Sequence, residues 1–242
     1  MTKNFILLAL IFFTTLSFSQ DKKVAVVSFY TDKTIGFSDL GIGSEELITR
    51  VANLRNNPDF NLTPILEKFH KTFFDEYSKK LPFQLLPEAE VLNDEAYKNF
   101  VPKLEGTEAE LSRYIVYDGY KYIYEGILGK ANEEGAAKLF SEADGVLFIE
   151  IHFSLVKGFG IGKTATIKMR ANYRMALYNK EGKKVFAINE AARSKKTTVM
   201  VKGIPVLSPK KILPMCESAM DKLMKHLDKK LKKIAKKADK KL

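Results

Sequence analysis

The sequence is short of the residues that build disulfides and metal sites. Its 242 residues include one cysteine, no tryptophan and three histidines. Because Cys216 has no partner in the chain, no intramolecular disulfide can form, and stability must come from buried side chains. Cys216 lies on the apolar stripe of a predicted helix, which favours a buried thiol over a cysteine that links two chains. His70, His152 and His226 lie at no metal-ligand spacing, so we expect no metal site.

Motifs for nucleotide binding and nucleophilic catalysis are also missing. Residues 157–164 end like a phosphate-binding loop, but Lys157 stands where that motif needs glycine, five positions before Gly162. The residues from Thr164 onward alternate as a strand, whereas the motif requires a helix there. No serine lies in a Gly-x-Ser-x-Gly turn. We therefore expect a flexible hairpin tip at this loop, no cofactor and no enzymatic activity.

The N-terminal residues have the pattern of a signal peptide rather than of a core helix. A basic start precedes the apolar run Phe5–Phe13, and small residues at Ser17 and Ser19 favour cleavage before Gln20. No stretch of the chain approaches the roughly 20 apolar residues needed to span a bilayer. No cysteine near the cleavage point could carry a lipid. We expect residues 1–19 to be removed and the mature protein to be soluble, not lipid-anchored, and periplasmic or extracellular.

Positive charge is abundant but lies in one segment. The formal net charge is +11, yet residues 222–242 hold ten lysines against two aspartates, while residues 21–221 hold 29 basic and 27 acidic side chains. A nearly neutral body argues against nucleic-acid binding. We interpret the lysine-rich segment as the solvated end of a helix that packs on the sheet. Alternatively it contacts an anionic membrane surface, through Lys229, Lys230, Lys232, Lys233, Lys236 and Lys237.

Three segments predict an antiparallel meander of long strands with one wet face. Val146–Val156 and Thr164–Leu177 each alternate apolar and polar residues over their whole length. A third strand is predicted at Lys184–Ala191, after a turn with glycine at Gly182.

The polar faces of the first two strands form the candidate site. A hairpin centred near Gly160 places Glu150 opposite Arg170 and His152 opposite Lys168, while apolar residues face apolar ones. We interpret these four residues as a solvated sheet face with cross-strand ion pairs. The alternatives are a site for an anionic ligand and an enzyme that uses Glu150, His152 and Arg170.

The remaining elements predict one α/β (α+β) domain. We expect a mixed or antiparallel sheet flanked by helices, with a long C-terminal amphipathic helix. A core domain over residues 20–209 is followed by the helix, with its lysine-rich end, over residues 210–242. Apolar spacing and caps predict a central strand at Lys23–Tyr30, helices near 44–54, 64–80, 94–100 and 132–142 and from Pro214 onward, and a short strand at Phe83–Leu86.

Five of the ten tyrosines lie between Tyr114 and Tyr124. If this segment is a strand, Tyr120, Tyr122 and Tyr124 share a face and could stack on a sugar or another planar group. Packing in the core or at a sheet edge is the interpretation that we favour.

The order of these elements is similar to that of the periplasmic α/β module of curli-secretion-channel (CsgG-like) proteins and of the N-terminal domain of TolB. The matching motifs are the strand Val24–Phe29, the Ala143-Asp144-Gly145 before a strand and the hairpin Tyr178–Gly182, within residues 23–235. The chain departs from these families by its missing lipoprotein cysteine and by Ile149-Glu150, where a glycine is common. The resemblance implies an envelope module without catalytic residues, and pore formation is not carried over.

Together these features predict an exported, non-enzymatic binding or assembly module of the bacterial cell envelope. Its expected partner is another envelope protein. The alternative function is peripheral binding to anionic surfaces through the lysine-rich C-terminal helix. Oligomeric state and ligand identity have no signal in the sequence.

Overall fold

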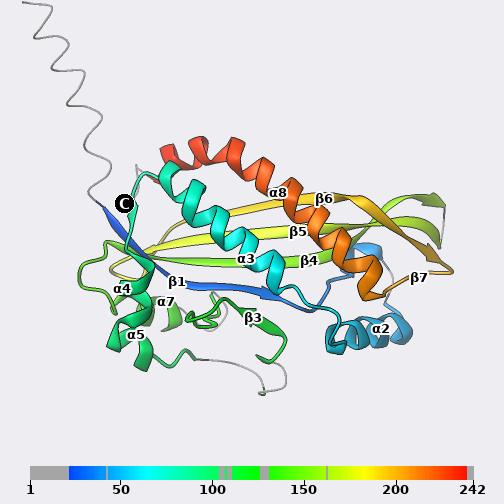
Figure 1. The fold of residues 1–242 in the computed structure, drawn as a ribbon, viewed down its shortest axis with the longest axis horizontal. Coiled ribbons are helices and arrows are strands. Elements are labelled where there is room, and N and C mark those ends of the chain that lie inside the picture. Colours follow the sequence, from blue (N-terminus) through cyan, green and yellow to red (C-terminus); the bar gives the residue numbers. More distant parts are fainter. Residues whose placement is uncertain are drawn as a thin grey trace, which may run out of the picture.

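The protein is described by a computed structural model over residues 22–41, 43–103, 107, 111–125, 131–161 and 163–238, with side chains as far as Leu231. The predicted signal peptide lies outside these residues. Seven strands form one mixed sheet in the order β2-β1-β4-β5-β6-β7, with β3 paired to β1 (Figure 1). The predicted α/β class, with its long-strand meander and its C-terminal helix on the sheet, is confirmed.

β1, Lys23–Asp32, is the central strand of the first half of the sheet. It runs parallel to β2, Gln84–Leu85, and to β4, Gly145–Ile161, and antiparallel to β3, Tyr114–Val116. Its residues after Lys23 are buried whichever way they point, because strands or helices cover both faces. The predicted central strand and the short β2 are confirmed.

The second half of the sheet is the meander of β4, β5 (Thr164–Asn179), β6 (Lys184–Val201) and β7 (Ile204–Pro205). Gly182 has the left-handed φ of 69° that the turn between β5 and β6 requires. β6 continues ten residues beyond the predicted end at Ala191, because cross-strand pairing with β5 resumes after a bulge near Lys168.

The register of the β4–β5 hairpin differs from our prediction by four residues. Glu150 lies opposite Arg174, and His152 lies opposite Asn172. The pairing continues to Ile161 opposite Thr164, so the strands join further along the chain than Gly160. An even shift leaves every side chain on its face, and apolar alternation therefore cannot distinguish the two registers.

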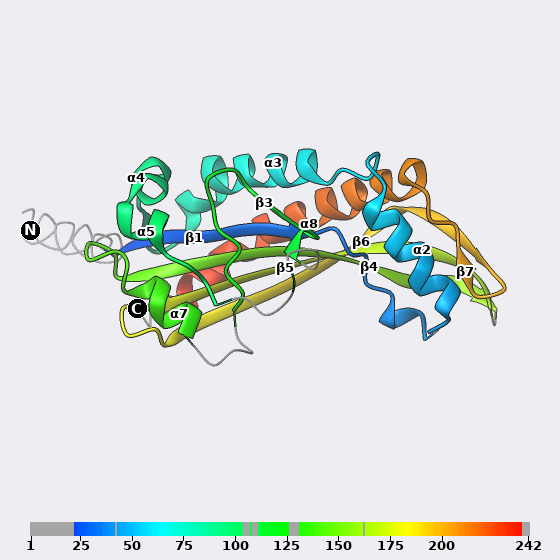
Figure 2. The ribbon, with the colours of Figure 1, turned by 90° about the horizontal axis from the view of Figure 1, so that it is seen from below.

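Three helical segments cover one face of the sheet and bury the larger core (Figure 2). They are α2, Glu45–Asn56; α3, Thr63–Thr72, prolonged by a π turn and a 3-10 turn to Lys80; and α8, Pro209–Ala238. α8 starts earlier than the predicted Pro214, because the Ser208 carbonyl accepts bonds from the amides of Lys211 and Ile212 and begins the helix there. Among the described residues, no helix combines the length and the apolar composition needed to cross a membrane.

The opposite face is covered only at one end. There α4, Glu88–Asn93, α5, Glu95–Asn99, and α7, Ala131–Ala137, enclose a second, smaller core with the first residues of β4 and the last of β5. α4 was not predicted as a helix, and α7 is shorter than predicted. Beyond that end, no α-helix of the described residues lies on this face of β4 and β5 (Figure 2). Only the 3-10 turn η1, Ser38–Leu40, reaches it there among the described helices, through Asp39, which pairs with Arg170.

Candidate functional site

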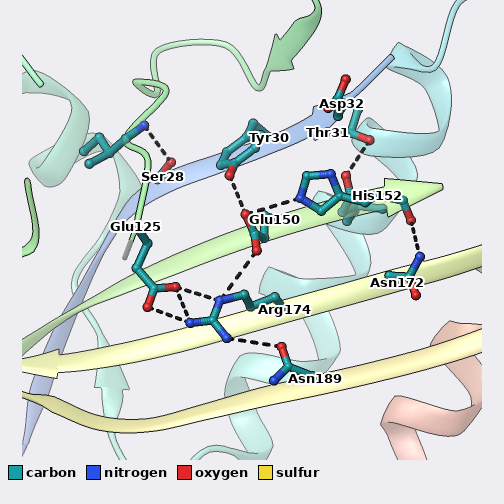
Figure 3. Close-up of polar contacts among 12 residues, drawn as sticks. Ser28, Tyr30, Thr31, Asp32, Glu125, Glu150, His152, Asn172, Arg174 and Asn189 are labelled. Carbon is teal, nitrogen blue, oxygen red and sulfur yellow. Dashed lines mark hydrogen bonds and ion pairs between the residues drawn. The ribbon is translucent and has the colours of Figure 1, made fainter. Parts of the chain in front are cut away.

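The uncovered sheet face carries a connected set of polar side chains. On β4, Glu150, His152 and Ser154 alternate with buried apolar residues, and on β5 Asn172 and Arg174 do the same. All five are partly exposed. We call this region, with the side chains that β1 and the loop before α7 add to it, the open-face site (Figure 3).

Glu150 is the centre of the open-face site. The hydroxyl of Tyr30 on β1 donates a short hydrogen bond to its carboxylate. His152 Nε2 lies 3.3 Å from Oε2, and Arg174 Nε lies 3.5 Å from Oε1. Three different side chains, from three strands, therefore hold one carboxylate.

These contacts keep Glu150 ionised. Burial acts to raise the pKa of Glu150, but its bonds to His152 and Tyr30 and the charge of Arg174 outweigh that effect and lower the pKa below its ordinary value. Burial and the neighbouring carboxylate raise the pKa of Tyr30 well above its ordinary value, so Tyr30 remains a donor. The open-face site is thus a stable charged network at neutral pH.

A second carboxylate, Glu125, binds the other side of Arg174. Arg174 donates to it twice, from Nε to Oε2 at 2.7 Å and from Nη2 to Oε1 at 2.6 Å, and its Nη1 donates to Asn189 at 3.2 Å. Tyr178 and Lys184 also contact Glu125, whose side chain is only 6% exposed. Burial acts to raise the pKa of Glu125, yet the bonds from Lys184, Tyr178 and Arg174 lower it. Glu125 was missed because a single acid after a tyrosine-rich segment has no periodic signal.

Aromatic rings form one border of the open-face site. Tyr30 packs edge-on against Tyr122 and Tyr114, and the rings of Tyr114 and Tyr122 stack with 4.0 Å between their centroids. Arg113 pairs with Asp32 at 3.1 Å and lies over the Tyr114 ring. The border is therefore rigid and amphipathic.

The tyrosine-rich segment is a strand only across β3, so the condition under which Tyr120, Tyr122 and Tyr124 would all share one face is not met. Tyr120 is buried in the larger core beside Phe29, whereas Tyr122 contacts Tyr30 on the opposite side of β1. The segment leaves the strand geometry because it turns at Gly119, whose φ of 79° is left-handed. The favoured interpretation, packing in the core, is therefore correct for Tyr120, whereas Tyr122 borders the open-face site.

A shallow hollow of about 340 Å³ lies over the open-face site. Its polar lining offers an exposed imidazole edge, amides and paired charges, from Glu150, His152, Asn172, Arg174, Asn189 and Glu190. These groups are planar donors and acceptors whose charges already compensate one another. Such a surface can hold a polar ligand by hydrogen bonds without leaving an uncompensated charge beneath it.

Of the four predicted site residues, the structure brings only Glu150 and His152 together. Glu150 and His152 contact each other, as the polar-face prediction required. Arg170 instead lies opposite Ser154 and pairs with Asp39 at 2.5 Å, and Lys168 lies opposite Val156. The predicted pairs Glu150–Arg170 and His152–Lys168 are therefore wrong, because the register is shifted by four residues.

The lysine-rich end of α8 is only partly described. Lys229 is exposed, and Lys230 Nζ lies 2.6 Å from Glu190 Oε1 at the rim of the open-face site. The side chains of Lys232, Lys233, Lys236 and Lys237 lie outside the described residues. The apolar stripe before them is buried as predicted, at Cys216, Met220, Leu223, Leu227 and Leu231.

The side chains of Cys216 and His70 are buried and packed against their neighbours. Cys216 is fully buried, and burial raises the pKa of its thiol. His70 is stacked on Tyr117 with 3.6 Å between ring centroids, and its Nε2 lies 2.6 Å from Glu88 Oε1. Within the described part of the chain, no group of three His, Cys, Asp or Glu residues could hold a metal ion.

Comparisons with known proteins leave the family open. No family model matches the chain, and no curated protein matches it. Among solved structures, the chain is similar to a protein of Helicobacter pylori described as a homolog of a neuraminyllactose-binding hemagglutinin. The two chains share 10% sequence identity with a TM-score of 0.38, and the match covers 91% of each.

Proposed function

We propose that this protein is an exported binding or assembly module of the bacterial cell envelope that holds a polar partner segment or ligand on the open-face site and catalyses no reaction. The observation that carries the proposal is the hollow over Glu150 and Arg174, where a charged network is held in place by β1, β4, β5 and Glu125. Preformed hydrogen-bonding groups on rigid strands lower the entropic cost of binding.

The arrangement supports binding better than catalysis. Glu150 and Arg174 each have their charge compensated by neighbours, so neither is poised to exchange a proton near neutral pH. Arg170, which the enzymatic alternative requires, lies against Asp39 instead of Glu150. A relation to the CsgG-like and TolB modules stays a hypothesis, supported by the order of the elements.

Site-specific photo-crosslinking in intact cells tests the proposal. A photoreactive amino acid at Ala191, an exposed residue on the rim of the hollow, should capture a discrete partner. The same probe at Glu67, exposed on α3 over the opposite face, is the matched control. Capture at Ala191 should be lost in His152→Ala. Equal capture at both positions, or capture that His152→Ala leaves unchanged, would contradict the proposal.

Peripheral binding through the lysine-rich helix is the second candidate, supported by the exposed Lys229 and the excess of lysine after it. Truncation at residue 221 cannot test it, because that removes the buried Leu223, Leu227 and Leu231. The suitable variant changes Lys229, Lys232, Lys233, Lys236 and Lys237 to glutamine and keeps Lys230, which pairs with Glu190. Cosedimentation with anionic vesicles at low and high salt should weaken in this variant, and equal binding would rule the tail out.

A further inference from the structure

Five exposed apolar side chains lie at the far end of the meander, where the strands project beyond α2 and the start of α8 (Figures 1 and 2). Phe159 and Ile161 on β4 are 88% and 87% exposed, more than any other large apolar residues in the described part of the chain. Val199, Val201 and Val206 are each about half exposed. We call these five residues the ribbon tip.

A β-bulge turns the β4 residues of the ribbon tip away from the core. The pairing register shifts between Lys157 and Gly160, and Gly160 then lies opposite Ala165, which is buried on the core-facing side. Side chains alternate along a strand, so Phe159 and Ile161 point to the open face instead. Without the bulge, both would continue the buried series that ends at Leu155.

β6 and β7 add their valines to the same face. Met200 lies opposite Ala165 and is fully buried, so its neighbours Val199 and Val201 point to the open face. The amide of Val206 donates to the carbonyl of Val199 at 3.0 Å, which places Val206 directly beside it. The ribbon tip is therefore one patch on one face, assembled from three strands.

The strands that carry the ribbon tip are basic. Residues 155–170 and residues 193–203 each contain four Lys or Arg and no Asp or Glu. The side chain of Asp39 lies on the same face but farther from the ribbon tip, where it pairs with Arg170 on β5. Lys202 is exposed at the tight turn before β7 and is the only described non-glycine residue with a positive φ, 54°.

We propose that the ribbon tip docks this protein on an anionic phospholipid bilayer. Phe159 and Ile161 enter the boundary between headgroups and acyl chains, and Lys163 and Lys202 contact lipid phosphates. Most of the strand backbone at the tip is paired in the sheet, and at the bulge the Phe159 carbonyl accepts a bond from the Thr166 hydroxyl at 3.0 Å, so insertion leaves few polar groups unsatisfied. Five side chains cover less than the roughly 800 Å² per partner that a stable protein interface buries, which favours a bilayer over a second copy of the chain.

This surface is separate from the lysine-rich end of α8. The last turns of α8 lie at the opposite end of the sheet from β7 (Figure 1). The two regions are therefore separate surfaces, and variants of each distinguish the two modes of binding by experiment. The ribbon tip also stands independently of the proposed function of the open-face site.

The absence of tryptophan from the chain makes a direct test possible. In residues 20–242 carrying Phe159→Trp, the single indole should shift its emission to the blue when vesicles of phosphatidylglycerol and phosphatidylcholine are added, and brominated lipids should quench it. Val101→Trp is the matched control, because Val101 is 84% exposed in the loop after α5. Its emission should not change.

Binding measurements on side-chain variants complete the test. Phe159→Ser and Ile161→Ser should each weaken vesicle affinity about tenfold. Lys163→Gln and Lys202→Asn should each weaken it about fivefold, and asparagine also suits the left-handed φ of that turn. Val101→Ser should have no effect. All five positions are exposed, so circular dichroism should show unchanged folding.

Three outcomes overturn the proposal. The first is unchanged emission of Phe159→Trp while the protein sediments with anionic vesicles, which would assign binding to another surface. The second is equal affinity for vesicles of phosphatidylcholine alone. The third is a blue shift without vesicles that grows with protein concentration, which would assign the ribbon tip to contact between two copies of the chain.

Discussion

The carboxylate of Glu150 on β4 lies opposite the guanidinium of Arg174 on β5, with 3.5 Å between Oε1 and Nε. The same guanidinium holds Glu125, which is more deeply buried. One arginine therefore compensates two carboxylates from distant parts of the chain. It couples the loop that precedes α7 to the middle of the meander.

Removing Arg174 should therefore cost much more stability than removing Arg170. In Arg174→Met, Glu125 and Glu150 lose their shared cation while still largely buried, and we expect a loss of about 2–4 kcal/mol in the free energy of unfolding. Arg170 pairs with Asp39, which is 40% exposed, so Arg170→Met should cost less than about 1 kcal/mol. Urea unfolding at neutral pH measures both. The reverse order of the two losses would contradict the observed register.

Stability should fall in acid because of the same carboxylates. Burial acts to raise the pKa of Glu125 and Glu150, but their bonds and charged neighbours lower it overall, whereas an unfolded glutamate titrates near about 4.3. A depressed folded-state pKa means that the stabilisation is complete above the unfolded value and is lost as pH falls through the folded one. The urea midpoint should thus be steady above about pH 5 and decrease below about pH 4. Glu150→Gln should reduce this dependence, and a midpoint unchanged down to pH 3 would contradict it.

The thiol of Cys216 should be unreactive in the native protein. It is fully buried on α8 and its pKa is raised by burial, so little thiolate forms and reagents cannot reach it. A colourimetric disulfide reagent at pH 8 should react with it only after denaturant is added. Fast reaction in buffer, or a disulfide-linked dimer under oxidising conditions, would refute the burial.

The start of β4 should not tolerate a side chain at Gly145. A Cβ built there lies 2.4 Å from the backbone oxygen of Tyr178 on β5, so Gly145→Ala must push the two strands apart. We expect a loss of about 1–3 kcal/mol in thermal or urea unfolding. Gly43 is the control, since a Cβ there meets nothing within 4 Å. Gly43→Ala should leave stability nearly unchanged, and equal effects would contradict this account.

Several elements could be predicted because their signal is local. The apolar stripe that contains Phe69 and Phe73 predicted α3 and its continuation, and Ser44 predicted the start of α2, where its hydroxyl accepts from the Leu47 amide. The site was predicted only in part. Glu150 and His152 were identified from alternation. Tyr30 and Arg174, which bind Glu150, and Glu125, which binds Arg174, come from segments whose relative positions the pattern does not contain.

The sequence by itself determined the long strands and the main helices, the side of each long strand that faces the core as far as Val156, and where the excess charge lies. These properties follow from the period of two or 3.6 along each segment and from composition. Only the tertiary structure decided that Glu150 meets Arg174, because a register shift of an even number of residues leaves alternation unchanged. It also decided that Phe159 and Ile161 face outward, because one bulge reverses the faces of all residues that follow it.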